Sequence, residues 1–210
     1  MAQLSRTSIR FILAAMPRVS AAHLTARREQ ILDAARACFL RKGFHATSMQ
    51  DVIAEADLSV GAVYRYFKSK NDLIAAIVER YVELVGETLA APGTDPAHRL
   101  ADGMRTAIDL IEENVGPDGV LRLAIQVWAE SLRDEAIAAM VRRVYGTMRA
   151  NFTRVAQRAV DAGDLPPDTD VEAVGSALLS LVIGYGLQRM LTGRPDPGSY
   201  ERGLRALLPH

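Results

Sequence analysis

The segment "LSVGAVYRYFKSKNDLI", from Leu58 to Ile74, crowds two tyrosines and a phenylalanine around Arg65 and follows them at once with lysines. A helix that is buried on all sides does not need these cations, and a fully solvated helix does not need three aromatic side chains. If Val63 and Phe67 face inward, the outer face carries Arg65 and small residues. The pattern therefore predicts a helix with a packed inner side and an outer side that contacts a polar partner.

The residues before this segment carry further helix signals. A first helix is expected to begin after Thr25 as its N-cap and to end at Gly43, with Phe44 packing back on Phe39. The sequence "TSMQ" has the form of a capping box with Thr47 as the N-cap of a short second helix. One helix that ends at Gly43 and a second that begins a few residues later predict a compact helical unit.

A three-residue turn separates this second helix from a third, for which Ser59 is the expected N-cap. The sequence "SKND", Ser69–Asp72, is expected to cap a fourth helix. This spacing is typical of a helix-turn-helix, whose second helix enters the major groove of DNA. Gly61 and Ala62 are small enough for close approach to DNA, and Arg65 can contact a guanine or a phosphate.

The longer run "ILDAARACFLRKGFHATSMQDVIAEADLSVGAVYRYFKSKNDLI" resembles the DNA-binding domain of the TetR family of bacterial transcriptional regulators. Its ordered pattern, "KGF…T" followed by "IA..A.LS.G..Y.YF.SK..L", extends over most of the first 75 residues. The resemblance leaves open whether Val60 packs inside or touches a thymine methyl group. It implies the following DNA contacts: Thr47, Ser59, Val60, Gly61, Ala62, Tyr64, Arg65, Tyr66 and Lys70.

The charge distribution agrees with a partner for the N-terminal region alone. The 210 residues have no net charge, but residues 1–70 carry 11 basic and 5 acidic side chains, a net charge of +6. A basic head on an acidic body indicates a polyanion as the partner of the head, although chance asymmetry gives the same charges. Cys38 is the only cysteine, and no run reaches the roughly 20 apolar residues of a membrane span. We therefore expect a cytoplasmic protein.

The whole chain is expected to be all-α, with about nine helices and no alternating strand pattern. Residues 1–22 are expected to form a flexible tail, and Met16 could serve as the start codon. Residues 23–72 are expected to form the helix-turn-helix domain, which a helix from residue 70 links to a ligand-binding and dimerisation domain over 73–210. Asp95 and Pro96 are expected to open one body helix, and Thr169 with Glu172 to form a capping box for another.

The helix expected from Thr169 to Thr192 has two apolar sides, which predicts that it is buried on two sides. In so small a domain the second surface is expected to contact another chain, although a central helix of a monomer would show the same pattern. Small residues on that stripe would let two helices approach closely. The expected homodimer interface comprises Ala173, Ala177, Ser180, Gly184, Leu187 and Leu191.

The C-terminal half resembles the ligand-binding half of TetR-type repressors, which implies a pocket for a small-molecule effector among its helices. Each candidate is an ordinary core residue in the alternative interpretation. The candidate lining residues are Met104, Ile108, Trp128, Tyr145, Met148, Phe152 and Tyr185. Candidate polar contacts are Gln126, Glu130, Asn151 and Gln188.

Signals for an enzyme, a metal site or a cofactor are absent from the sequence. There is no GxSxG, GxGxxG or Walker motif, and the four histidines lack metal-ligand spacing. The sequence therefore predicts a ligand-responsive regulator, expected to be a repressor that binds a near-palindromic double-stranded DNA operator as a homodimer. The alternatives are a helical carrier for a hydrophobic molecule and a TetR-like activator without ligand control.

Overall fold

The computed structural model describes residues 21–91 and 99–207, and over these ranges the fold is all-α, as the sequence predicts. The expected tail, Met16 and the helix start at Asp95 and Pro96 lie outside the described residues. The described part contains nine helices: α2 (Ala21–Lys42), α3 (Met49–Glu55), α4 (Val60–Tyr66), α5 (Lys70–Ala90), α6 (Arg99–Glu112), α7 (Val120–Ser131), α8 (Glu135–Ala162), α9 (Val171–Thr192) and α10 (Pro197–Leu207).

The first helix is longer at its start than expected. Thr25 lies inside α2 rather than at its N-cap, because α2 already includes Ala21. The end of α2 is as predicted: Gly43 adopts a left-handed φ of +85°, and its N–H donates to the Phe39 carbonyl at 2.9 Å. The Phe39 and Phe44 rings lie 5.2 Å apart, so the expected contact across the helix end is confirmed.

Two of the predicted capping positions are wrong by one residue. Ser48, not Thr47, is the N-cap of α3, and it forms a capping box with Asp51. Asp170, not Thr169, is the N-cap of α9, where its carboxylate accepts from two backbone N–H groups. The expected caps of α4 and α5 are confirmed, since Ser59 caps α4, and Ser69 and Asp72 form the box of α5.

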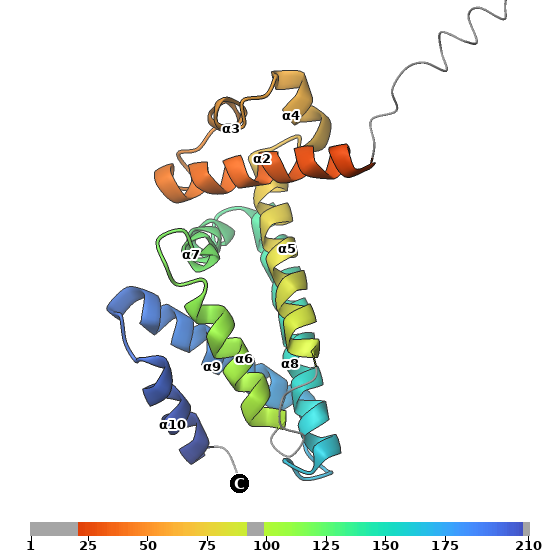
Figure 1. Cartoon of the computed structure of the whole chain (residues 1–210), viewed down its shortest axis with the longest axis vertical. Coiled ribbons are helices and arrows are strands. Elements are labelled where there is room, and N and C mark those ends of the chain that lie inside the picture. The colour runs from red at the N-terminus through yellow and green to blue at the C-terminus, as the bar shows by residue number, and fades with distance from the viewer. Residues whose placement is uncertain (1–20, 92–98, 208–210) are drawn as a thin grey trace, which may run out of the picture.

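The helices α2, α3 and α4 form the upper part of the molecule in Figure 1, here called the head. Within the head, α3 and α4 lie on one side of α2. Its core contains the predicted inner residues of three helices, among them Phe39, Val52, Val63 and Phe67, all of them buried. Burial of each such side chain stabilises the fold by about 1.5–3 kcal/mol. The same core continues into α7 through the fully buried Leu123, so the head and the body share a packed contact.

The body is built around α6, α8 and α9, and α5 runs from the head down to it (Figure 1). The helices α8 and α9 approach so closely at Gly175 that a Cβ atom there would lie 2.6 Å from the Thr153 backbone nitrogen. Glu112 on α6 accepts hydrogen bonds from Tyr185 at 2.6 Å and from Arg189 at 2.8 Å, both on α9. Burial opposes the ionisation of Glu112, but these two donors outweigh it and lower its pKa.

By length and composition alone, α9 would be able to cross a membrane, although no run of about 20 apolar residues occurs in the sequence. The core helix of a soluble protein passes the same test. In this structure Leu178, Leu179, Val182 and Tyr185 of α9 are buried against the neighbouring helices of the body. On this side, the apolar residues of α9 therefore pack within the chain.

Candidate functional site

The helices α3 and α4 and the residues Ala56–Ser59 between them form a helix-turn-helix. Asp57 adopts a positive φ of +51° in this turn, and the Leu58 N–H donates to the Ile53 carbonyl. The turn is one residue longer than the expected three, because α3 ends earlier, at Glu55. Val63 and Phe67 anchor α4 in the head core, so its opposite face is directed away from the protein.

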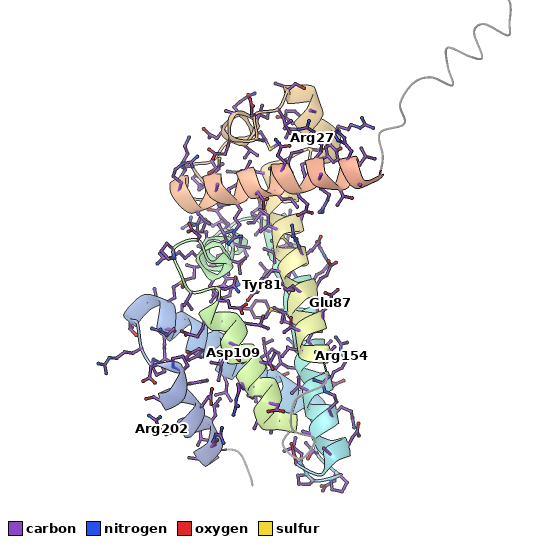
Figure 2. The ribbon with its side chains drawn as sticks, viewed as in Figure 1. Arg27, Tyr81, Glu87, Asp109, Arg154 and Arg202 are labelled. Atoms are coloured by element: carbon purple, nitrogen blue, oxygen red, sulfur yellow. The ribbon has the colours of Figure 1, made fainter. Side chains whose placement is uncertain are left out.

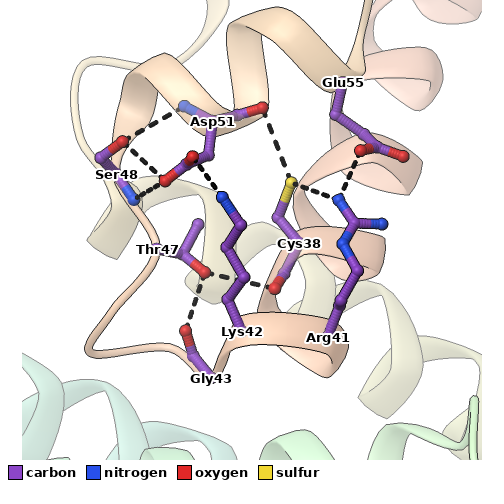
Figure 3. A network of polar contacts seen from close by, with 8 residues as sticks. All are labelled: Cys38, Arg41, Lys42, Gly43, Thr47, Ser48, Asp51 and Glu55. Carbon is purple, nitrogen blue, oxygen red and sulfur yellow. Dashed lines mark hydrogen bonds and ion pairs between the residues drawn. The ribbon is translucent and has the colours of Figure 1, made fainter.

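Polar contacts between the end of α2 and the start of α3 hold the motif on its supporting helix (Figure 3). Lys42 Nζ lies 2.6 Å from the Asp51 carboxylate, and Arg41 lies 2.5 Å from that of Glu55. The Lys42 ammonium and the Ser48 donors lower the pKa of Asp51 well below its usual range. Such exposed ion pairs each contribute little stability, but here they join helices whose relative position sets the presentation of α4.

The outer face of α4 presents most of the predicted DNA contacts to solvent. Ser59, Gly61 and Arg65 are exposed, and Val60 is 51% exposed, so its side chain does not pack inside. The other three predicted residues of α4 are half-buried: Ala62, Tyr64 and Tyr66. The accessible surface of α4 is thus small near its start, at Gly61, and basic and partly aromatic toward its end.

The side chains of Thr47 and Lys70, two of the predicted DNA contacts, make hydrogen bonds within the head in this DNA-free structure. Thr47 is only 2% exposed, and its hydroxyl donates to the Gly43 carbonyl at 2.7 Å. The Lys70 ammonium has three donors, and they reach the carbonyls of Phe44, His45 and Thr47 at 3.0, 2.9 and 3.3 Å. Both side chains therefore help to fix the loop between α2 and α3.

The body contains an apolar cavity of about 90 Å³ below the head, between α5, α6, α7, α8 and α9. Three of the predicted pocket residues line it: Trp128, Tyr145 and Met148. The rings of Trp128 and Tyr145 lie 6.4 Å apart and tilted at 58°, within the range of favourable aromatic contact.

The other four predicted lining residues do not reach this cavity. Phe152 and Tyr185 are at most 1% exposed and belong to the body core. Met104 and Ile108 are buried too, and they border a separate small crevice between α6 and α10. None of the four predicted polar contacts lines the apolar cavity either: Gln126, Glu130, Asn151 and Gln188.

Gln126 instead joins the body to the head. Its side-chain carbonyl accepts from the Phe44 N–H at 2.6 Å, just beyond the end of α2. On the same helix, Glu130 lies 3.5 Å from the imidazole of His45. The Arg36 guanidinium donates to the carbonyl of Asp118, in the segment before α7. The sequence shows Gln126 only as a polar residue between two apolar residues that line the cavity. That position does not predict a hydrogen bond to Phe44, 82 residues earlier in the chain.

The predicted interface stripe on α9 is accessible in the single chain. Ala173, Ala177 and Ser180 are exposed, and Leu191 is 68% exposed. A Cβ atom at Gly184 would meet no other atom within 4 Å. Leu187 lies on this stripe and also in the wall of the cavity. The stripe is therefore an apolar surface that the described residues leave uncovered.

Over residues 21–91 and 99–207, no group of three or more His, Cys, Asp or Glu side chains is placed to hold a metal ion. Cys38 is buried in the head, where burial raises the pKa of its thiol. Its Sγ lies 3.7 Å from the Asp51 carbonyl, within the contact between α2 and α3 (Figure 3). This cysteine acts as a packed core residue in the described structure.

Comparison with known proteins extends over both halves of the chain. Residues 31–77 match the family model described as "Bacterial regulatory proteins, tetR family", and residues 96–210 match "BetI-type transcriptional repressor, C-terminal". The regulator UidR of Escherichia coli K12 is 30% identical over 184 residues, which cover 86% of this chain and 90% of UidR. The regulator BetI of Serratia proteamaculans is 26% identical over 80% of this chain and 82% of BetI.

Solved structures agree with these sequence matches. Salmonella enterica GusR superimposes with a TM-score of 0.74 at 27% identity, over 90% of this chain and 98% of GusR. A tetR-family regulatory protein from Rhodococcus RHA1 has a TM-score of 0.62 at 26% identity, over 87% and 94% of the two chains. These relatives are transcriptional regulators and not enzymes. The chain therefore belongs to the TetR family of bacterial transcriptional regulators.

Proposed function

We propose that this regulator is a cytoplasmic repressor that binds a near-palindromic operator as a homodimer and is released by a small-molecule effector. Its DNA-binding domain comprises residues 23–72, and its effector-binding and dimerisation domain comprises 73–210. The matching C-terminal family model is described as a transcriptional repressor. A Mycobacterium tuberculosis protein that is 35% identical over 78 residues is also named a transcriptional repressor.

The operator contacts are assigned to the outer face of α4. Gly61 and Ala62 allow α4 to approach base edges, and Arg65 supplies a cation for guanine or phosphate. Ser59 and Val60 lie at the start of the helix, and Tyr64 and Tyr66 lie toward its end. Thr47 and Lys70, which are hydrogen-bonded within the head, are assigned a supporting role in the loop before α3.

The homodimer is assigned to the stripe on α9, with α10 beside it. An exposed apolar helix face is a typical self-association surface, and its small residues permit close helix contact. Tyr200 on α10 stacks on Tyr185 at 4.5 Å and donates to the Leu181 carbonyl, which holds α10 next to α9. A two-fold axis along this surface would present two α4 helices to half-sites about 34 Å apart.

The proposal of release by an effector rests on one observation: α7 both lines the cavity and contacts the head. Ala124, Ile125 and Trp128 of α7 line the cavity, and Gln126 among them accepts from the Phe44 N–H. Val127 and Met140 belong both to the cavity wall and to the core shared with the head. A ligand that displaces α7 would therefore change the support of α2, with a coupling typically of 1–3 kcal/mol.

Replacing Gln126 by alanine tests this route. Duplexes selected from a random library would serve as operator, and effectors would be screened by their release of the protein from DNA. Gln126→Ala is expected to retain DNA binding, while saturating effector changes its DNA affinity at least about threefold less than that of the unmodified protein. Gln157→Ala, exposed on α8, is the matched control. Equal release in both variants would contradict a route through Gln126.

A further inference from the structure

The cavity has a chemical character that restricts its ligand. Nineteen described residues line it, and none of them is an aspartate, glutamate, lysine, arginine or histidine. Most are aliphatic, and three methionines, Met140, Met148 and Met190, add adaptable walls. A charged ligand would lose its hydration here without meeting an opposite charge, which is strongly unfavourable. The walls therefore favour an uncharged molecule.

Three lining side chains retain polar groups, and they come from three helices: Tyr81 on α5, Trp128 on α7 and Tyr145 on α8. Within the described part of the chain, neither tyrosine hydroxyl nor the indole N–H makes a hydrogen bond to protein. Burial raises the pKa of Tyr81 to about 12 and also raises that of Tyr145, so both hydroxyls remain donors at neutral pH. Almost none of the accessible cavity wall is polar, so these three groups leave the wall apolar.

Tyr81 also marks a boundary between apolar and charged surroundings. Together with Val120 it borders both the cavity and a larger groove, whose walls include Arg36, Arg80 and Glu87. Figure 2 shows Tyr81 on the side of α5 that faces α6, whereas Glu87 lies further along the same helix. Charged groups therefore line the neighbouring groove but not the wall of the cavity, which is uncharged.

We propose that the cavity binds a small, uncharged, mostly apolar molecule of about the size of one ring. This inference rests on the proposed function, because it names the chemical class of the effector. The volume of about 90 Å³ is smaller than that of an apolar cavity of about 150 Å³ that binds benzene in another protein. A ligand of one ring is therefore the upper limit, and the flexible methionine side chains of the wall would have to move to admit it. The Trp128 and Tyr145 rings would contact the ligand.

Three probes of one shape and different charge test the proposal on the full chain: benzyl alcohol, benzoate and protonated benzylamine. Binding would be measured from the emission of Trp128, the only tryptophan, and from the thermal unfolding midpoint. Benzyl alcohol is expected to change both, with an affinity at least about tenfold higher than that of either ion, because an ion loses its hydration in the cavity. Equal or tighter binding of benzoate or benzylammonium would overturn the proposal.

Two substitutions locate the binding. Ala124→Leu adds three carbon atoms to the cavity wall and should reduce benzyl alcohol binding at least about tenfold, since overpacked apolar sites exclude ligand. The control is Leu132→Ala, at a position that is 87% exposed just after α7, and it should bind as the original chain does. If Ala124→Leu does not fold, Met148→Ala enlarges the cavity and should improve binding of 2-naphthylmethanol relative to benzyl alcohol. Binding that is insensitive to both cavity substitutions would place the probe elsewhere and overturn the proposal.

A parallel mobility-shift assay with selected duplex DNA separates this inference from the proposed function. A chain that binds DNA but shows no preference for the neutral probe would refute the ligand class and leave the repressor standing. A chain that binds benzyl alcohol through the cavity but no DNA would refute the repressor and leave the ligand class standing.

Discussion

Gly61 lies on the outer face of α4, and a Cβ atom there would meet no other atom of the chain within 4 Å. Packing inside the protein therefore gives no reason for glycine, whereas a DNA surface approaching α4 does. Gly61→Leu is expected to leave the thermal unfolding midpoint unchanged or slightly raised, because glycine is a poor helix former. Its DNA affinity should fall at least about tenfold from steric exclusion.

Gly146→Leu provides the control for this prediction, because Gly146 is exposed on α8 and a Cβ there is equally unobstructed. Both variants would be compared by mobility shift on the same selected duplex. Normal DNA binding by Gly61→Leu would show that α4 does not approach DNA through this face.

Lys70 and Arg65 are both cations near the DNA-binding face, but the structure gives them different roles. Arg65→Ala should lower the dependence of log affinity on log salt concentration by about one, as expected for a lost phosphate contact. Lys70→Ala should leave that slope unchanged and lower the unfolding midpoint by several degrees, because three carbonyls lose a shared donor. Salt titrations and thermal melts of both variants would check this. A reduced slope for Lys70→Ala would return that residue to the DNA contacts.

At the scale of single elements, periodicity and stop signals in the sequence predict the helices well but leave their first residues uncertain. Thr47 and Ser48 are adjacent, and either hydroxyl has the chemistry of an N-cap. The structure selects Ser48 because Asp51 completes its capping box, while Thr47 turns inward to the Gly43 carbonyl. At α9, Asp170 replaces Thr169 because its carboxylate accepts from two N–H groups at the helix start.

The cavity was only partly predictable for a related reason. Helical periodicity identifies Trp128 and Phe152 alike as inward-facing, but it does not distinguish a packed neighbour from an empty space. That distinction depends on how five helices meet, and the structure assigns Trp128 to the cavity and Phe152 to the core. Contacts between distant segments, such as Gln126 with Phe44, leave no periodic trace at all.

The exposed stripe on α9 gives a prediction about dimer formation. Gly184→Arg places a long charged side chain on the exposed stripe, where a single chain has room for it. The original chain is expected to sediment as a dimer at micromolar concentration and the variant as a folded monomer, because the dimer would bury an unpaired charge. Gly146→Arg on α8 is the matched control and should remain dimeric. A monomeric original chain would contradict the assignment of α9.

At the scale of the whole molecule, the head and the body are joined by packing as well as by polar contacts. Leu123, Val127 and Met140 of the body complete the core around Phe39 and Val63 of the head. Such shared packing transmits displacements, because close-packed interiors respond to changes of even one methylene group. Two heads linked in this way to one dimer would occupy two half-sites at a fixed spacing.

The most direct test of this account is footprinting of the full chain on duplexes selected from a random library. The account predicts an inverted repeat, with two protected half-sites about one helical turn, roughly 34 Å, apart, occupied together by one dimer. The affinity should fall steeply with salt, because the net charge of +6 in residues 1–70 makes phosphate contacts the main source of attraction. Failure to enrich any sequence, or protection of a single half-site by a monomer, would contradict the account.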